Sequence, residues 1–284
     1  MSSDKIKAYN FFNEAESISE YNDIYNSLDF SNEYPANKKR LEIFLQIIEK
    51  ISPNKILDVG CGNGMPLLAI LKKGYDAMGF DKALNMVKEA KKNLSENGFN
   101  EDKVFTGDFE NFHISENFDC ILGMGAFYYS SDPLKTIKSV SDKLPQDGNI
   151  IFSLRNKLFD LISLNSYTSK FLKDLYYSKE ESPFQDKLNE HYAKIFDDEI
   201  KINSIDSKKV LSSVHNPLTV KDDLLLPSGL ELQGIYFYHF HAYPPKYEKI
   251  SPQFFREKSW SMENPLDWKG NFLASAFIVH AKKI

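Results

Sequence analysis

The glycine-rich stretch at residues 55–64, KILDVGCGNG, constrains this chain more than any other part of its sequence. It opens with an apolar run, interrupted only by Asp58, of the kind found in buried parallel strands. The closely spaced glycines that follow let a backbone turn tightly and approach a ligand. Residues 65–71 are mostly apolar, and Pro66 suits the first turn of a helix. The stretch therefore predicts a strand, a ligand-binding turn and a helix.

The alternation of strand and helix continues after this turn. Residues 74–81 predict a second strand that ends in Asp81, and residues 83–98 predict a helix with Gly98 as its C-cap. The inner side of that helix is expected to carry Leu84, Val87, Ala90 and Leu94.

Three more strands are predicted further along the chain. Residues 103–109 predict a short strand ending in Asp108, and residues 118–129 predict a fourth strand with residues 123–129 at its carboxyl end. Residues 148–154 predict a fifth. Ligands bind at the carboxyl ends of strands in open parallel sheets, so these ends are where a site is expected.

Together, the glycine turn and the acids Asp58, Asp81 and Asp108 resemble the motifs of class I S-adenosylmethionine-dependent methyltransferases. The resemblance implies an α/β fold with a Rossmann-like, seven-stranded, mostly parallel sheet whose last strand is antiparallel. It also implies S-adenosylmethionine as the cofactor. The dinucleotide fingerprint G-x-G-x-x-G fits less well because the third glycine comes one residue early, so an NAD-dependent oxidoreductase is a distant alternative.

The cofactor-binding residues are predicted from these motifs. Asp81 stands at about the spacing at which an acid meets a ribose hydroxyl. In the family, the position of Asp108 reads the adenine amine and its neighbour packs on the ring, which Phe109 suits. An isolated aspartate in such a loop is often only a helix cap or turn residue. The full predicted set is Asp58, Gly60, Cys61, Gly62, Asp81, Lys82, Asp108, Phe109 and Gly123.

The composition suits one soluble domain with a sizeable core, since 42% of the 284 residues are hydrophobic and 26% are charged. No apolar stretch reaches the roughly 20 residues that span a bilayer. The first residues lack the apolar core of a secretory signal, so a cytoplasmic location is expected. A net charge of −5 argues against a nucleic-acid substrate, and two isolated cysteines indicate neither disulfides nor a thiolate metal site.

Within a single domain of residues 1–284, four segments are predicted. Residues 37–156 form the cofactor-binding core and begin with a helix at 37–51, whose inner face carries Leu41, Phe44, Leu45 and Ile48. Residues 157–229 form an insertion with helical pieces at 158–180 and 191–200. We interpret this insertion, together with residues 1–36, as a lid over the acceptor pocket. Residues 230–284 form a β-hairpin that completes the sheet.

The strand YFYHFHAYPP in this hairpin supplies the first candidates for catalysis. Strand alternation predicts that His239 and His241 lie on one face with Phe237, and that Tyr236, Tyr238 and Phe240 lie on the other. Either histidine could handle the acceptor's proton, because imidazole titrates near neutral pH. The alternative is a hydrogen-bonded structural role. No carboxylate or cysteine pattern completes a metal site around the pair.

Two other residues are candidates for binding the acceptor. Arg155, just past the fifth strand, could hold an anionic acceptor, although a salt bridge to the lid would explain it equally well. Tyr128, after the fourth strand, could position the acceptor or form a wall of the methyl pocket.

The acceptor class is inferred from the segment after the fourth strand. The Asn-Pro-Pro-aromatic motif of many amino-methylating enzymes is absent, and GMGAFYY stands there. This favours O-methylation of a small molecule, such as a sugar nucleotide or a phosphorylated metabolite. Three segments, residues 154–168, 236–245 and 267–279, also resemble those of bacterial methyltransferases from surface-polysaccharide and capsule pathways. The alternatives are an N-methyltransferase acting on a protein and a cofactor-binding regulator without turnover. The oligomeric state is not predicted.

Overall fold

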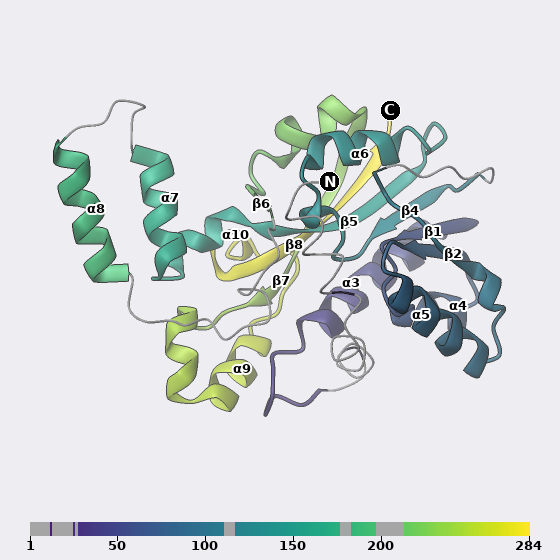
Figure 1. The fold of residues 1–284 in the computed structure, drawn as a ribbon, viewed down its shortest axis with the longest axis horizontal. Coiled ribbons are helices and arrows are strands. Elements are labelled where there is room, and N and C mark those ends of the chain that lie inside the picture. Colours follow the sequence, from purple (N-terminus) through teal and green to yellow (C-terminus); the bar gives the residue numbers. More distant parts are fainter. Residues whose placement is uncertain (1–11, 13–24, 26–27, 111–116, 177–182, 197–212) are drawn as a thin grey trace.

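The computed structural model describes residues 12, 25, 28–110, 117–176, 183–196 and 213–284. Its centre is one sheet in the order β3-β2-β1-β4-β5-β8-β7, with a short β6 beside the end of β5 (Figure 1). The strands are β1 Lys55–Val59, β2 Asp76–Asp81, β3 Val104–Thr106, β4 Cys120–Gly123, β5 Asn149–Asn156, β6 Val214–His215, β7 Leu230–Phe240 and β8 Ala274–Lys283.

The strand directions confirm the predicted Rossmann-like sheet. Strands β1 to β5 pair in parallel, whereas β8 lies antiparallel between β5 and β7. Strand β7 therefore runs in the same direction as the core strands. Its carboxyl end lies at the same edge of the sheet as theirs, which is the edge where parallel sheets bind ligands.

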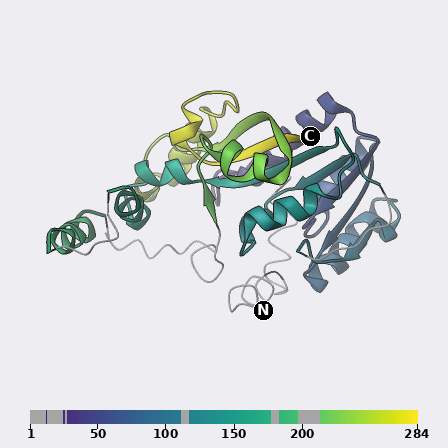
Figure 2. The ribbon, with the colours of Figure 1, turned by 90° about the horizontal axis from the view of Figure 1, so that it is seen from above.

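Helices cover both faces of the sheet (Figures 1 and 2). One face packs against α3, α4 and α5, and the other against α6 and residues 220–225. The apolar faces of these helices meet strand residues that are almost completely buried, so the core consists of two layers. The helices are α3 Ala36–Ile51, α4 Met65–Lys72, α5 Leu84–Glu96, α6 Pro133–Ser141, α7 Ser166–Tyr176, α8 Pro183–Phe196, α9 Pro252–Trp260 and α10 Gly270–Leu273.

Some details of the elements differ from the prediction. The inner face of α5 includes Met86, 1% exposed, rather than Leu84, which is 48% exposed at the first residue of the helix. Strand β3 ends at Thr106, and Gly107 leads the chain on to Asp108. Leu45 of α3 is only partly buried, and a polar residue, Arg40, is buried on that helix instead.

The predicted alternation along β7 is wrong near its end. Phe237 and Phe240 pack into the same core layer, whereas alternation would place them on opposite faces. The reason is His239, whose φ of 60° lies in the left-handed region that side chains other than glycine rarely adopt. This residue rotates the chain locally, so the pleat loses its alternation between Tyr238 and Phe240.

The insertion after β5 contains helices, as predicted, but they do not cover the sheet. Helices α7 and α8 extend away from the sheet in both ribbon views (Figures 1 and 2). Leu175, Tyr176 and Phe184 are more than half exposed on them. Residues 177–182 and 197–200 of the predicted helical pieces lie outside the described residues.

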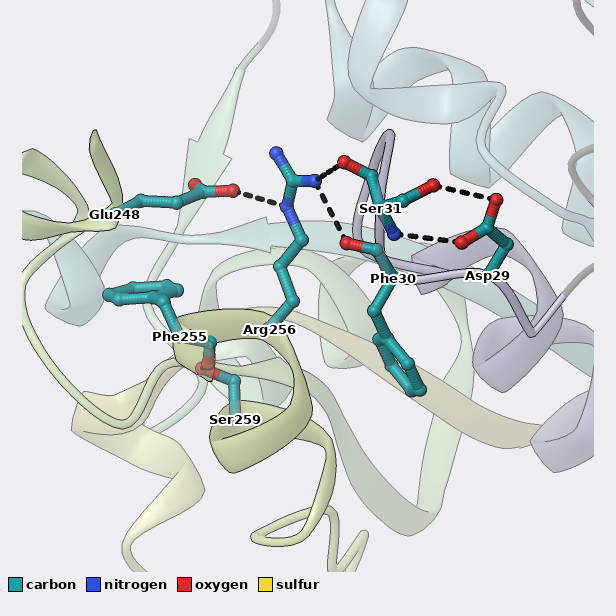
Figure 3. Close-up of polar contacts among 7 residues, drawn as sticks. All are labelled: Asp29, Phe30, Ser31, Glu248, Phe255, Arg256 and Ser259. Atoms are coloured by element: carbon teal, nitrogen blue, oxygen red, sulfur yellow. Dashed lines mark hydrogen bonds and ion pairs between the residues drawn. The ribbon is translucent and has the colours of Figure 1, made fainter. Parts of the chain in front are cut away.

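The segment that precedes α3 is fixed to the loop between β7 and β8 (Figure 3). Arg256 of α9 donates through Nη1 to the carbonyl oxygens of Phe30 and Ser31, at 3.0 and 2.8 Å. Its Nε donates to Glu248 at 2.6 Å. We call residues 28–35 the strap, since they tie α3 to α9. Within the described residues, no helix has both the length and the apolar character that crossing a membrane requires.

Candidate functional site

A cavity opens at the carboxyl ends of β1, β2 and β4. Of the nine predicted cofactor-binding residues, eight line it: Asp58, Gly60, Cys61, Gly62, Asp81, Lys82, Asp108 and Phe109. Gly123 does not. A Cβ atom there would lie 2.7 Å from the Phe127 ring, so this glycine makes room for a core side chain.

The glycine turn forms one wall of the cavity. Gly60 has a φ of 74°, and a Cβ atom on it would lie 2.6 Å from the Cβ of Ala126. Both the backbone conformation and the close approach therefore require glycine at this position. The amide of Gly62 donates to Asp81 Oδ2 at 2.9 Å, which ties the turn to the end of β2.

Asp58 is fully buried, and neither of its carboxylate oxygens has a hydrogen-bond partner among the described residues. Burial, together with the nearby charge of Asp81, raises its pKa to about 7, and the charge of Arg40 opposes this rise. A buried carboxylate without donors is costly. A cationic ligand with N–H groups would satisfy it.

Arg40, which the sequence analysis missed, supplies the opposite charge. It is 7% exposed and lines the same cavity. Its Nη2 donates to Asn37 Oδ1 at 2.7 Å and to the Tyr25 hydroxyl at 3.2 Å. Its buried Nε has no acceptor among the described residues. The one available signal was a cation four residues before Phe44 on an otherwise apolar helix face.

Beyond the glycine turn, acids continue along the cavity. Asp81 also accepts from the Ala83 amide at 2.8 Å, and burial raises its pKa. Lys82 Nζ lies 2.6 Å from Asp108 Oδ2, and both side chains are about one-third exposed. Phe109 packs edge-on against Phe127 with ring centroids 6.1 Å apart.

The charges and shapes of this cavity fit a nucleoside that carries an amino acid. Asp58 can hold an ammonium group and Arg40 a carboxylate, at neighbouring points of the wall. Asp81 can accept hydrogen bonds from ribose hydroxyls, while Asp108 can accept from a base amine and Phe109 offers a flat apolar face.

The four predicted catalytic residues are divided between two places. Tyr128 lines the cavity, with its ring centroid 4.6 Å from that of Tyr129. His239, His241 and Arg155 do not line it. Arg155 lies at the carboxyl end of β5, the strand next to β4, and the two histidines lie at the carboxyl end of β7, which β5 and β8 separate from β4.

The two histidines are neutral at physiological pH. Burial lowers the pKa of His239 to about 4, and the charge of Arg155 acts in the same direction. Burial also holds the pKa of His241 well below its usual value, with a further contribution from His239. Each can exchange hydrogen bonds with a ligand, but such a low basicity makes either a weak general base.

The predicted lid segments also differ in position. Phe12 and Tyr25, from residues 1–36, line the cavity. No described residue of 157–229 does so. The lid role of that insertion therefore stays a prediction.

A family model described as "Methyltransferase domain" matches residues 52–200. Among curated proteins, ubiquinone biosynthesis O-methyltransferases are similar to this chain. The one from Actinobacillus pleuropneumoniae serotype 5b is 32% identical over 126 residues, which cover 43% of this chain and 54% of that protein. The one from Histophilus somni is 29% identical over 136 residues, which cover 46% of this chain and 57% of that protein. The chain thus spans little more than half the length of these relatives.

Among solved structures, magnesium protoporphyrin IX methyltransferase from Synechocystis PCC 6803, with bound SAH, has a similar fold. The TM-score is 0.61 at 12% identity, and the alignment covers 99% of this chain and 100% of that one. At this identity the likeness extends to the fold alone.

Proposed function

Because this chain belongs to the methyltransferase-domain family, matched over just over half of its 284 residues, we propose that it transfers a methyl group from S-adenosylmethionine to an oxygen of a small molecule. The observation that carries this proposal is the pair of buried, opposite charges that line the cavity, Asp58 on β1 and Arg40 on α3. Asp58 and Arg40 both lack partners at buried atoms, and both face the cavity. An amino acid's ammonium and carboxylate groups would supply those partners.

The remaining lining residues match the rest of the cofactor. Asp81 would hold the ribose, and Asp108 and Phe109 the adenine. Asp108 is paired with Lys82, so Lys82 would reorient when the base enters. When bound, S-adenosylmethionine supplies an electrophilic methyl group on a sulfonium. The chain's own contribution is alignment, because in-line transfer gains most from holding the two reactants in the correct geometry.

Tyr128 is suited to the wall beside the transferred methyl group. It follows β4, and the Gly125 amide of the same segment donates to Ser153 Oγ at 2.8 Å, which fixes this segment to β5. A Cβ atom on Gly125 would lie 3.1 Å from the Tyr128 hydroxyl and 2.5 Å from Arg40 Nη1. Gly125 thus lets the tyrosine and the arginine approach each other in the cavity wall.

An oxygen acceptor is supported by the names of the curated relatives, which are O-methyltransferases. These names refer to ubiquinone biosynthesis and give no support to the surface-polysaccharide pathway that the sequence suggested. A sugar-linked or phosphorylated acceptor remains a proposal. His239 and His241 would receive hydrogen bonds from the acceptor rather than act as charged groups.

The test is mass spectrometry of a small-metabolite pool incubated with the protein and deuteromethyl-labelled S-adenosylmethionine. We expect one class of small product to acquire the label. Arg40→Met should reduce labelling by at least tenfold through weaker cofactor binding, whereas Lys38→Met, on the same helix, should not. Labelled polypeptide without a small product would instead indicate the protein N-methyltransferase. Cofactor binding without any transfer would indicate the regulator.

A further inference from the structure

A second group of polar side chains, of which His241 is buried and the others are partly buried, lies at the carboxyl end of β7. Tyr34 stacks on His239 with ring centroids 4.6 Å apart, and His239 lies 4.6 Å from His241. The Tyr34 hydroxyl donates to Glu263 Oε1, which also accepts from the Phe240 amide at 2.9 Å. We call these four side chains, Tyr34, His239, His241 and Glu263, the paired-histidine cluster.

Three buried atoms in the cluster have no hydrogen-bond partner among the described residues: His241 Nδ1, His241 Nε2 and Glu263 Oε2. The His241 side chain is packed between the rings of Phe159 and Phe255, and the residue is only 8% exposed. An unsatisfied buried polar atom costs about 1–3 kcal/mol. Three in one cluster indicate that the arrangement is built to meet a ligand.

Backbone strain gives an independent indication at the same place. His239 adopts a φ of 60°, a conformation costing roughly 1–3 kcal/mol for a residue that is not glycine. Such conformations gather at ligand-binding sites because the surrounding structure must hold them. Here the His239 ring stacks on Tyr34 and the residue is partly exposed, whereas His241 is buried.

The unpartnered atoms define the chemistry of a ligand that would fit here. A neutral imidazole has one N–H donor and one acceptor nitrogen, and a carboxylate oxygen only accepts. Because Nδ1 and Nε2 point away from each other across the ring, one hydroxyl of a ligand can meet only one of them, and a second group must donate to Glu263 Oε2. Two neighbouring hydroxyl groups meet this demand, because one can exchange a hydrogen bond with a His241 nitrogen while the other donates to Glu263. A phosphate dianion offers no donor and would face the Glu263 carboxylate.

We propose that the paired-histidine cluster binds a vicinal diol of the methyl acceptor. This inference rests on the proposed function, and it narrows the acceptor to molecules with two adjacent hydroxyls. The cluster is well placed for the role. It lies at the ligand-binding edge of the sheet, beyond β4 and β5 as seen from the cofactor cavity. Sugar rings and catechols both carry such a diol.

The primary test is binding, because it does not require turnover. Saturation-transfer NMR would be recorded on the full chain loaded with S-adenosylhomocysteine. The diol ligands are catechol and the methyl glycosides of glucose, galactose, mannose and rhamnose. The control ligands, which have no vicinal diol, are cyclohexanol, phenol and 3-hydroxypropyl phosphate. We expect a glycoside or catechol to bind, with the other three giving no signal. Signal from a glycoside or from catechol identifies the source of the diol.

Two variants locate the binding. His241→Phe keeps an aromatic ring between Phe159 and Phe255 but removes both ring nitrogens. It should weaken diol binding at least tenfold while leaving cofactor affinity unchanged and the melting temperature equal or higher. Glu263→Gln should weaken it less, because an amide group still bonds to a hydroxyl. His280→Gln alters the buried histidine that pairs with Asn149 on β8 and should change nothing in diol binding.

The outcomes separate this inference from the proposed function. Suppose that the native protein binds diols but transfers no methyl group, and that His241→Phe abolishes the binding. This result supports the cluster as a diol site and counts against the methyltransferase activity. The inference is overturned if phenol or 3-hydroxypropyl phosphate binds as well as the diols. It is also overturned if His241→Phe leaves diol binding unchanged. Neither result counts against the methyltransferase activity. With an active enzyme, the same variant should raise KM for the diol more than it lowers kcat.

Discussion

At the scale of single residues, the cofactor cavity is marked by charges that make little sense in an empty protein. Asp58 and Arg40 are both buried, yet they form no direct ion pair among the described residues. Both carboxylate oxygens of Asp58 lack a donor and the Nε of Arg40 lacks an acceptor among the described residues, and an unsatisfied buried charged group is costly. Such an arrangement gains stability only when a ligand of complementary charge enters.

Asp58→Asn should make the empty protein more stable and cofactor binding weaker. The folded pKa of about 7 is above the ordinary value of 3.8, so Asp58 favours the folded state at low pH, and this contribution is lost as the pH rises towards 7. At pH 8 the substitution removes an unpaired buried charge, a gain of about 1–3 kcal/mol. Thermal denaturation of the empty protein at pH 5 and pH 8 checks this.

Cofactor affinity should depend on pH through the same group. Below pH 7, Asp58 is protonated in the empty cavity, so binding an ammonium group must expel a proton. Affinity for S-adenosylhomocysteine should fall as the pH decreases from 7 to 5.5 in the native protein and stay level in Asp58→Asn. Calorimetric titration at several pH values measures both. A parallel decline in the two proteins would remove Asp58 from the cofactor site.

Asp81→Ala should weaken cofactor binding by about 1–3 kcal/mol, the usual range for a hydrogen bond to a charged group. The carboxylate also accepts from the Gly62 and Ala83 amides, so the glycine turn loses support as well. Asp102→Ala, on an exposed turn, is the matched control. Fluorescence or calorimetric titration gives the two affinities, and equal values would contradict the ribose assignment.

The sequence predicted the residues whose role follows from local pattern and missed those that depend on packing. The acids at or near the ends of three successive strands and the glycines between β1 and α4 could be placed from spacing alone. Arg40 could not, because a single cation on an apolar helix face is ordinarily a surface residue. The break of alternation at His239 also escaped, since nothing in YFYHFH requires a left-handed residue.

At the scale of elements, the strap links two distant segments of the chain to the cofactor cavity. It is fixed to α9 by Arg256 (Figure 3), and Phe30 and Tyr34 pack against Trp260. It runs directly into α3, which carries Asn37 and Arg40 into the cavity. The loop between β7 and β8 thereby supports the position of α3.

Arg256→Gln should loosen the strap without unfolding the sheet. It removes a charged donor from two carbonyl oxygens and from Glu248, at a cost of about 1–3 kcal/mol. Amide hydrogen exchange of residues 28–35 should accelerate, while that of β1 and β4 stays slow. Lys258→Gln, exposed on the same helix, is the control. Unchanged exchange in the strap would show that its aromatic contacts alone hold it.

Element boundaries were predictable where the hydrophobic period is strong. Helix α3 begins at Ala36 and α4 at Met65, each within one residue of expectation, and the alternation of β1, α4, β2, α5 and β3 along the chain follows from the sequence. The direction of α7 and α8 was not predictable. A helical pattern indicates which face is apolar but not whether the helix folds back over the sheet or extends from it.

At the scale of the whole molecule, the sheet depends on its antiparallel strand. Strand β8 bonds to β5 on one side and to β7 on the other, and Phe277, Ile278 and Val279 are fully buried. Without it, the apolar residues of β5 would face water along an open edge.

Removing residues 230–284 should therefore abolish the native fold and leave at most a collapsed state. Near-UV circular dichroism should be lost while part of the far-UV signal remains. As a control, replacing α8, residues 183–196, with a glycine-serine linker should preserve both signals, because α8 has no buried residue among those described. A truncated chain with native near-UV signal would show that β1 to β5 fold on their own.

The position of Arg40 has a consequence for exchanging parts between enzymes. The family match begins at residue 52, whereas the arginine that faces Asp58's side of the cavity stands twelve residues earlier, on α3. A cassette cut at the family boundaries would transplant the glycine turn and its acids but leave their counter-charge behind. Chimeric enzymes built on this scaffold should therefore take α3 and the strap together with the cassette. The segment that keeps the cavity intact begins before residue 52, where the family match begins.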